Sequence, residues 1–166
     1  TMLQHMGESL KITLMGYGLG CLIGIPLGIL MAWYKPVDMF VRPIFDLLKP
    51  VPGIAWIPIM VVFFGIGLMS KVMVIFLTVL ISTIMNAYAG IKQSKDVHLW
   101  VGQTFGASRF QMLLRIGIPT ALPFIMTSLR IALAAGWLAI VAAEMLGASR
   151  GLGFMISQAR AVQRSD

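Results

Sequence analysis

Charged side chains are scarce in this sequence. Only 6 acidic and 13 basic residues occur among 166, so charged residues make up 11% of the chain, whereas a soluble domain typically carries about 25%. Hydrophobic residues make up 58%, and the mean hydropathy is +0.90. This composition excludes an ordinary soluble domain and predicts a membrane protein. The bases form short clusters between apolar runs, without the aromatic-interleaved basic stripe of a nucleic-acid binder, so membrane lipid is the favoured charged partner.

Catalytic and metal-binding motifs are also missing. The sequence has no GxxxxGK[ST] phosphate loop, no HExxH, no CxxC and no GxSxG. Cys21 stands alone inside an apolar run, which excludes an internal disulfide or a cysteine metal cluster. His5 and His98 lie in polar connectors, where a solvated side chain is favoured over a ligand. We therefore predict no catalytic residue, no metal site and no cofactor bound by this chain.

Apolar segments of membrane-spanning length define the expected fold. Crossing roughly 30 Å of hydrocarbon takes about 20 helical residues. We predict spans over residues 12–34, 54–68, 72–91 and 119–146. The second is short and follows Pro50, Pro52 and Gly53, so we expect it to be kinked or partly re-entrant. The predicted fold is an all-α membrane protein, a polytopic helical bundle of about four spans.

Basic residues are distributed unevenly among the connectors. The connector between the second and third spans carries only Lys71. The other two connectors carry Lys35, Arg42, Lys49, Lys92, Lys95, Arg109 and Arg115. The positive-inside rule places these two in the cytoplasm, so both ends of the chain lie outside. The tail after Gly151 is expected to form a short amphipathic helix on the outer surface.

Small residues recur at fourfold spacing in two of the spans. The two sets are Gly16, Gly20, Gly24 and Gly28 in the first span, and Ala135, Ala139, Ala143 and Gly147 in the fourth. Residues four apart lie on one face of a helix, and small side chains there let another backbone come close. We predict that both ridges pack helices together, in preference to contacting a solute.

Polar residues inside the spans are the candidates for a solute path. Thr78, Ser82 and Asn86 share one face of the third span, where they either hold helices together or line a path. Arg130 is expected to extend its stem toward the cytoplasmic surface. Glu144, near the outer end of the fourth span, is the one acidic candidate within a span. Its alternatives are a structural anchor, which is favoured, and a gate.

The connector over residues 96–115 is too long and too polar for a simple turn. We predict two short helices. Asp96 is placed to cap a first helix that starts at Val97, and Gly106 breaks that helix. Ser108 and Gln111 have the spacing of a capping box for the second helix. Pro119 then fits the first turn of the fourth span.

Large apolar side chains stand out in this polar connector. Phe105 and Phe110 are flanked by Arg109 and Arg115. Such a bent pair of helices suits a groove on another protein. An interfacial helix that uses its aromatic residues as lipid anchors is the alternative, and local physics does not separate the two.

The same connector resembles the EAA loop of permease subunits in bacterial ATP-binding-cassette (ABC) importers, written EAA-x3-G-x9-I-x-LP. Gly106, nine residues and then Ile116-x-Ile118-Pro119 match its second part. The EAA triplet falls on Trp100, Val101 and Gly102, so the acidic residue is absent, and Ile118 replaces leucine. The resemblance implies that this loop docks on a cytoplasmic ATPase. The coupling residues that it implies are Trp100, Val101, Gly102, Phe105, Gly106, Ser108, Arg109, Phe110 and Pro119.

Other stretches resemble the nitrate, sulfonate, taurine and bicarbonate branch of these permeases. They include "PVPGIAWIPIMVVFFGIGLMSKV", "NAYAGIK" and "TFGASRFQMLLRIGIPTALPFIMTSLRIALAAGWLAIVAAEMLGASRGLGFMI". The agreement runs from about residue 8 to about residue 161. Members of the family have five to six spans. Residues 1–166 are thus expected to form a single permease domain that lacks a first and a last span.

The resemblance implies a complete transport system around this chain. Its partners would be a second permease subunit, a cytoplasmic ABC ATPase dimer that holds ATP and Mg, and an extracytoplasmic solute-binding protein. The chain would lie in the bacterial inner membrane and move a small solute, favoured to be an anion, by alternating access. Two alternatives stay open: an ion-coupled secondary carrier, and a membrane scaffold that transports nothing.

Overall fold

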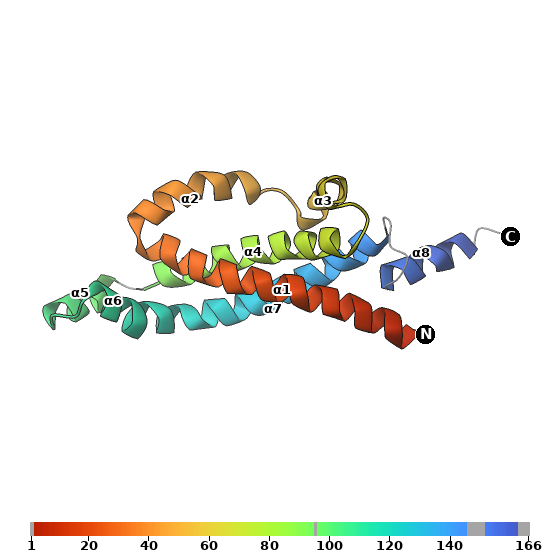
Figure 1. Cartoon of the computed structure of the whole chain (residues 1–166). Coiled ribbons are helices and arrows are strands. Elements are labelled where there is room, and N and C mark those ends of the chain that lie inside the picture. Colours follow the sequence, from red (N-terminus) through yellow and green to blue (C-terminus); the bar gives the residue numbers. More distant parts are fainter. Residues whose placement is uncertain (1, 95, 146–151, 163–166) are drawn as a thin grey trace. The chain divides into compact units, whose positions relative to one another are not determined.

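Helices make up all of the regular structure in the part of the chain that the computed structural model describes, residues 2–94, 96–145 and 152–162 (Figure 1). The predicted all-α fold is therefore confirmed. The elements are α1 (Met2–Trp33), α2 (Lys35–Leu48), η1 (Gly53–Ala55), α3 (Trp56–Phe64), α4 (Leu68–Lys92), α5 (Asp96–Thr104), α6 (Arg109–Met112), η2 (Leu113–Gly117), α7 (Ile118–Met145) and α8 (Leu152–Val162).

Close contacts divide the chain into two compact units. Unit 1 comprises Thr1–Gly20, Pro50–Val79 and Ala132–Asp166, and unit 2 comprises Cys21–Lys49 and Leu80–Ile131. The long helices α1, α4 and α7 each contribute residues to both units. Apolar cores form in each unit, around Ile57, Val74, Ala139 and Ala143 in unit 1 and around Ala87, Ile91, Leu113, Ala121 and Ile125 in unit 2.

Three described helical stretches are long and apolar enough to cross a membrane: His5–Trp33, Leu68–Lys92 and Arg109–Met145. Two shorter stretches, Lys35–Leu48 and Gly53–Phe64, qualify together as a fourth span if the pair is taken as one broken span. This agrees with the prediction of about four spans. The expected kink in the second span is a complete break, because Pro50 and Pro52 interrupt the helix between α2 and η1.

The connector predicted before the second span is largely helical. Residues 35–48 form the 14-residue helix α2, and α3 has only nine residues. Pro36 fits the first turn of α2, where the missing N–H costs nothing. The overlooked signal was charge spacing: Lys35, Asp38, Arg42, Asp46 and Lys49 recur every three or four residues and so mark one polar helix face.

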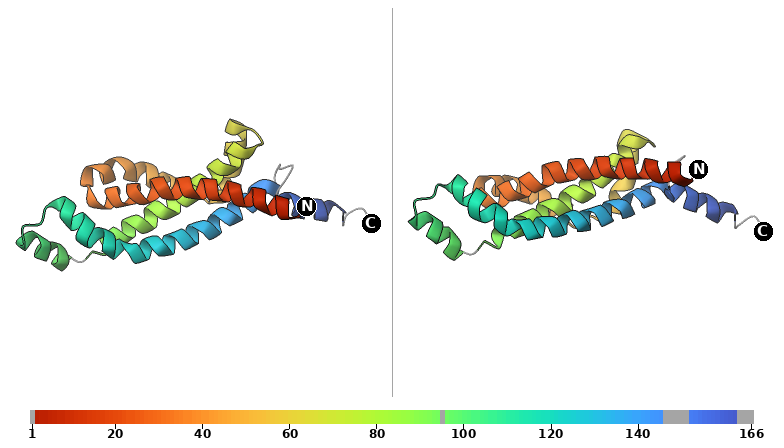
Figure 2. Two further views of the ribbon diagram at one scale, coloured as in Figure 1. Left: turned by 60° about the horizontal axis from the view of Figure 1, so that its bottom comes forward. Right: turned by 90° about the horizontal axis from the view of Figure 1, so that it is seen from below.

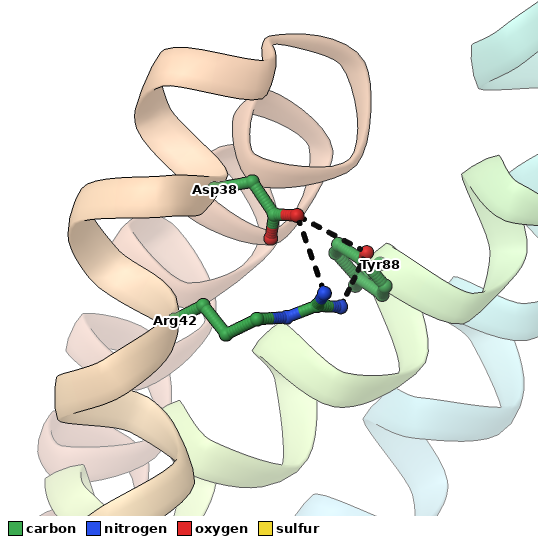
Figure 3. A network of polar contacts seen from close by, with 3 residues as sticks. All are labelled: Asp38, Arg42 and Tyr88. Atoms are coloured by element: carbon green, nitrogen blue, oxygen red, sulfur yellow. Dashed lines mark hydrogen bonds and ion pairs between the residues drawn. The ribbon is translucent and has the colours of Figure 1, made fainter.

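A polar network attaches α2 to α4 inside unit 2 (Figure 3). The Arg42 guanidinium donates a hydrogen bond of 2.6 Å to the Tyr88 hydroxyl and lies 3.6 Å from the Asp38 carboxylate. Its Cζ atom is 5.2 Å from the centre of the Tyr88 ring, and the Lys92 ammonium is 5.6 Å from the same centre. Tyr88 is therefore the side chain through which two cations and one carboxylate of this unit are held together.

The glycines predicted to form a ridge on α1 lie against α4. A Cβ atom added at Gly16 would lie 2.7 Å from Ile75 Cβ, and one at Gly20 would lie 2.7 Å from Val79 Cγ1, both within unit 1. In unit 2, a Cβ atom at Gly28 would lie 2.7 Å from the Ile84 carbonyl oxygen, and one at Gly24 would collide with the Thr83 hydroxyl. In both units these distances leave no room for a side chain on that face of α1.

Gly20 offers a direct test of this packing, because Gly18 on the same helix is a matched control. Gly20→Leu forces a side chain into Val79, so we expect it to lower the free energy of unfolding by at least about 1–3 kcal/mol. Gly18 has no atom within 4 Å of an added Cβ, so Gly18→Leu should change stability little. Thermal unfolding of the two purified variants measures the difference. Equal unfolding temperatures would show that the glycine ridge is not a packing surface.

Candidate functional site

The candidate site is the bent segment of residues 96–117, which comprises α5, the turn at Gly106, α6 and η2; we call it the platform. It lies entirely in unit 2. Figure 2 shows α5 turned back from α6 across this bend. The structure thus contains the two short helices predicted for residues 96–115. The side chain of Asp96, predicted to cap the first of them, lies outside the described residues.

Gly106 ends α5 in a Schellman motif. Its φ angle is +73°, in the left-handed region that strongly favours glycine. The Ala107 N–H donates to the Gly102 carbonyl at 3.0 Å, and the Gly106 N–H donates to the Gln103 carbonyl at 2.9 Å. These are the two hydrogen bonds that define the motif. The glycine shared with the EAA loop is thus explained by its backbone conformation, which fixes the angle at which the chain leaves α5.

A complete capping box starts α6 directly after this turn. The Gln111 N–H donates to the Ser108 hydroxyl oxygen at 3.3 Å, and the Ser108 N–H donates to the Gln111 side-chain oxygen at 2.9 Å. The predicted box is therefore present. Because Gly106 and Ser108 satisfy the backbone on both sides of the bend, the bend has a defined geometry of its own.

The second helix of the platform continues into the fourth span, which corrects the prediction that Pro119 begins a new helix. Arg109–Met145 is one helical stretch, interrupted only by the π-helical turn η2. The Ile118 N–H donates to the Leu113 carbonyl, five residues back, which widens the helix immediately before Pro119. A regular helix would press the proline ring against the carbonyl of Arg115. Helix α6 and the first part of α7 therefore form one continuous helical stretch.

Large apolar side chains cover the free side of the platform. Trp100 is 65% exposed, Phe105 is 86% exposed and Phe110 is 61% exposed. On the other side, Met112 and Leu113 are buried, and a Cβ atom at Gly102 would lie 3.3 Å from the Met112 side chain. The platform therefore packs on unit 2 through Met112 and Leu113, and its three large aromatic rings are exposed.

The polar residues proposed for a solute path are divided between the two units. Thr78 and Glu144 belong to unit 1, whereas Ser82, Asn86 and Arg130 belong to unit 2. The Thr78 hydroxyl donates to the Val74 carbonyl, and the Asn86 amide donates to the Ser82 carbonyl, so both are bonded within α4. Gly53 approaches Thr78 closely, which favours the packing alternative for this residue. Arg130 is exposed.

Glu144 is buried inside unit 1, and both of its carboxylate oxygens accept hydrogen bonds. The Ser9 hydroxyl donates to its Oε1 atom at 2.6 Å, and the Gly153 N–H donates to its Oε2 atom at 2.9 Å. Only 1% of Glu144 is exposed. The carboxylate thereby joins α1, α7 and α8, as the favoured anchor role requires. Neither Ser9 nor Gly153 was among the predicted site residues, and a hydrogen bond between residues 135 positions apart, such as that of Ser9, leaves no pattern in a sequence.

The structure describes part of the C-terminal tail and part of the small-residue ridge on α7. The helix expected after residue 151 is present as α8, and Gly153 packs against Glu144 of α7. In the other ridge, Ala139 and Ala143 are buried. Ala135 is half-buried, and Gly147 lies outside the described residues.

Comparison with known proteins gives the family. Residues 24–165 match the family described as binding-protein-dependent transport system inner membrane component. The taurine transport system permease protein TauC of Escherichia coli (strain K12) is 43% identical over 159 residues, which cover 96% of this chain and 58% of TauC. The nitrate import permease protein NrtB of Leptolyngbya laminosa is 36% identical over 152 residues, which cover 92% of this chain and 54% of NrtB.

A further relative and a solved structure agree with these matches. The bicarbonate transport system permease protein CmpB of Synechococcus elongatus is 33% identical over 149 residues, covering 89% of this chain and 54% of CmpB. A chain of the MetNI methionine ABC transporter has the same fold, with a TM-score of 0.81 and 20% identity over 99% of this chain and 82% of that one. The chain spans less than two thirds of the length of TauC, NrtB and CmpB.

The apolar helices and the extent of the family match define a multi-pass protein of the inner membrane. The chain belongs to the binding-protein-dependent transport system inner membrane component family. The predicted family and membrane location are therefore confirmed. Membership of a family of transport components agrees with the prediction of a non-catalytic subunit.

Proposed function

We propose that this chain is the transmembrane permease subunit of an ATP-driven importer. The observation that carries this proposal is the platform: a bend with fixed geometry that exposes three aromatic rings and continues through η2 into a membrane-spanning helix. Such a segment is suited to receive force at the inner face and pass it to α7. Trp100 and Val101 on α5 and Ser108, Arg109 and Phe110 around the start of α6 would contact the partner, whereas Gly102 packs against Met112 on the buried side.

The partners in this proposal follow from the family. An ATPase dimer in the cytoplasm binds ATP and Mg and receives the platform, a second permease subunit completes the solute path, and an extracytoplasmic binding protein delivers the solute. ATP binding draws the ATPase subunits together, the platform moves with them, and the spans alternate between outward and inward access. The names of TauC, NrtB and CmpB favour a small anion such as a sulfonate, taurine, nitrate or bicarbonate as the solute.

The ion-coupled carrier is the weaker alternative because of Glu144. A proton-coupled carrier relies on titratable groups inside its spans. Both carboxylate oxygens of Glu144 accept hydrogen bonds from buried groups, so this side chain is arranged as a structural anchor. A scaffold, in turn, would have no need of a rigid bend that exposes aromatic rings beside a spanning helix.

Removing the aromatic rings tests the docking surface. Phe105→Ala combined with Phe110→Ala should weaken binding of the ATPase to the permease at least about thirtyfold, because exposed aromatic anchors contribute on the order of 1–2 kcal/mol each at interfaces. Phe63→Ala is the matched control, since Phe63 is 77% exposed but lies on α3 of unit 1. Binding is measured by titrating the ATPase into permease held in nanodiscs. A control variant as weak as the double variant would contradict docking at the platform.

A further inference from the structure

A pocket of about 330 Å³ lies in unit 2, behind the platform. Trp33 at the end of α1, Lys92 at the end of α4, Ser94, Gln103 of α5 and Arg109 of α6 line it. The volume is within the range of small-molecule sites, about 300–1,000 Å³. The proposed contact with the ATPase shares Arg109 with this pocket but does not account for its other lining residues.

The lining of the pocket is positively charged. Among the described residues that line it, Lys92 and Arg109 are ionised and none is acidic. Lys92 is positioned by the ring of Tyr88, 5.6 Å from its ammonium, and Arg109 stands in the first turn of α6. Two cations that line one pocket attract an anionic group, and Gln103 adds an amide that can donate a hydrogen bond.

Ser94 gives an independent indication of a ligand. Its hydroxyl is buried and has no hydrogen-bond partner among the described residues, although Ser94 lines the pocket. Buried hydroxyl groups are almost always hydrogen-bonded in folded proteins, so an unpaired one beside a cavity calls for an explanation. An anion held between Lys92 and Arg109 would provide an acceptor for it.

The other half of the lining is apolar and favours an anion with a hydrocarbon part. The Trp33 indole packs against Gly117, where an added Cβ would lie 3.2 Å from its Cζ3 atom. Ala32, Ile91, Leu99 and Met112 complete the apolar surface. An inorganic anion would leave these side chains without contacts, whereas a short alkyl chain would cover them.

We propose that this pocket binds a small organic anion, a sulfonate or carboxylate with a short apolar tail. The acid group lies between Lys92, Arg109 and the Ser94 hydroxyl, and the tail lies against Trp33. A bound anion bridges α4 and α6, and therefore links occupancy of the pocket to the position of the platform. Only this last step rests on the proposed function; binding itself does not.

Anion binding in the pocket is tested by equilibrium dialysis of radiolabelled ethanesulfonate. The assembled complex is held in phosphatidylcholine nanodiscs, without the binding protein. Lys92→Gln should weaken binding about tenfold, and Ser94→Ala about threefold to tenfold, which corresponds to the loss of one charge-assisted hydrogen bond. Lys35→Gln removes a base that does not line the pocket and should change the Kd less than about twofold. Neutral ethyl methyl sulfone should not compete.

Several results would overturn the proposal. Unchanged binding in both Lys92→Gln and Ser94→Ala would do so, as would equal competition by the neutral sulfone. Nanodiscs that contain phosphatidylglycerol provide a second arm: strong competition by this anionic lipid would assign the pocket to a headgroup instead of a free anion. ATP-driven uptake measured on the same preparation separates anion binding from the proposed function. Uptake can fail while the anion still binds, and uptake can persist while the anion does not bind.

Discussion

Gly106→Val is expected to uncouple ATP hydrolysis from transport while the protein still reaches the membrane. Gly106 has a φ angle of +73°, and a β-branched residue held in that region carries about 1–3 kcal/mol of strain. An added Cβ meets no atom within 4 Å, so the effect acts through the backbone and not through a collision. Relief of the strain breaks the Schellman motif and changes the angle between α5 and α6, which separates Phe105 from Phe110.

The expected size follows from the strain. A penalty of about 1–3 kcal/mol lowers the equilibrium constant for the docking-competent bend roughly 5-fold to 150-fold. Solute-stimulated ATPase activity of the reconstituted complex should fall by a similar factor. Gly106→Asn is the matched control, because asparagine tolerates the left-handed region better than other side chains, so this variant should keep most of the activity. Wild-type activity in Gly106→Val would contradict a coupling role for the bend.

Replacing Glu144 is expected to have the largest effect on stability. Glu144→Leu leaves the Ser9 hydroxyl and the Gly153 N–H without their carboxylate acceptor in a site where Ser9 is fully buried. Loss of both charge-assisted hydrogen bonds should lower the free energy of unfolding by about 2–4 kcal/mol. Thermal unfolding of the purified protein, followed by the loss of soluble, monodisperse material, measures this effect.

The variant Glu144→Gln distinguishes a structural role of Glu144 from a role in gating. A glutamine oxygen can still accept from the Gly153 N–H, and its amide can donate to the Ser9 hydroxyl oxygen, so about half or less of the stability should be lost. Transport by the folded fraction should persist. If Glu144→Gln instead unfolds like the native protein but transports nothing, the carboxylate acts in transport, and its assignment as a structural anchor is wrong.

Local features of the platform could be predicted from sequence because they depend on neighbouring residues. A glycine between two short helical segments and a serine three residues before a glutamine are sufficient signals for the bend and for the capping box. The continuity of α6 with α7 was not predicted, because a proline such as Pro119 is typical of the first turn of a helix. A π-helical turn that accommodates the proline has no comparable sequence signature.

In helix α2, the charges that argue against a membrane span also predict an amphipathic helix. The search for spans relies on uninterrupted apolar length, and five charges between residues 35 and 49 removed this segment from consideration. The same charges, spaced every three or four residues, predict an amphipathic helix. The packing partner of Glu144 and the lining of the pocket behind the platform depend on residues far apart in the sequence, which no periodicity encodes.

The dependence of uptake on nucleotide is the most direct test that the platform receives force from a separate ATPase. The complete complex is purified from its native host and reconstituted in vesicles with the binding protein outside and ATP inside. We predict that labelled solute accumulates only with hydrolysable ATP and that dissipating ion gradients leaves uptake unchanged. Accumulation driven by an ion gradient with ATP withheld, or purification of the intact protein without any ATPase, would contradict this function.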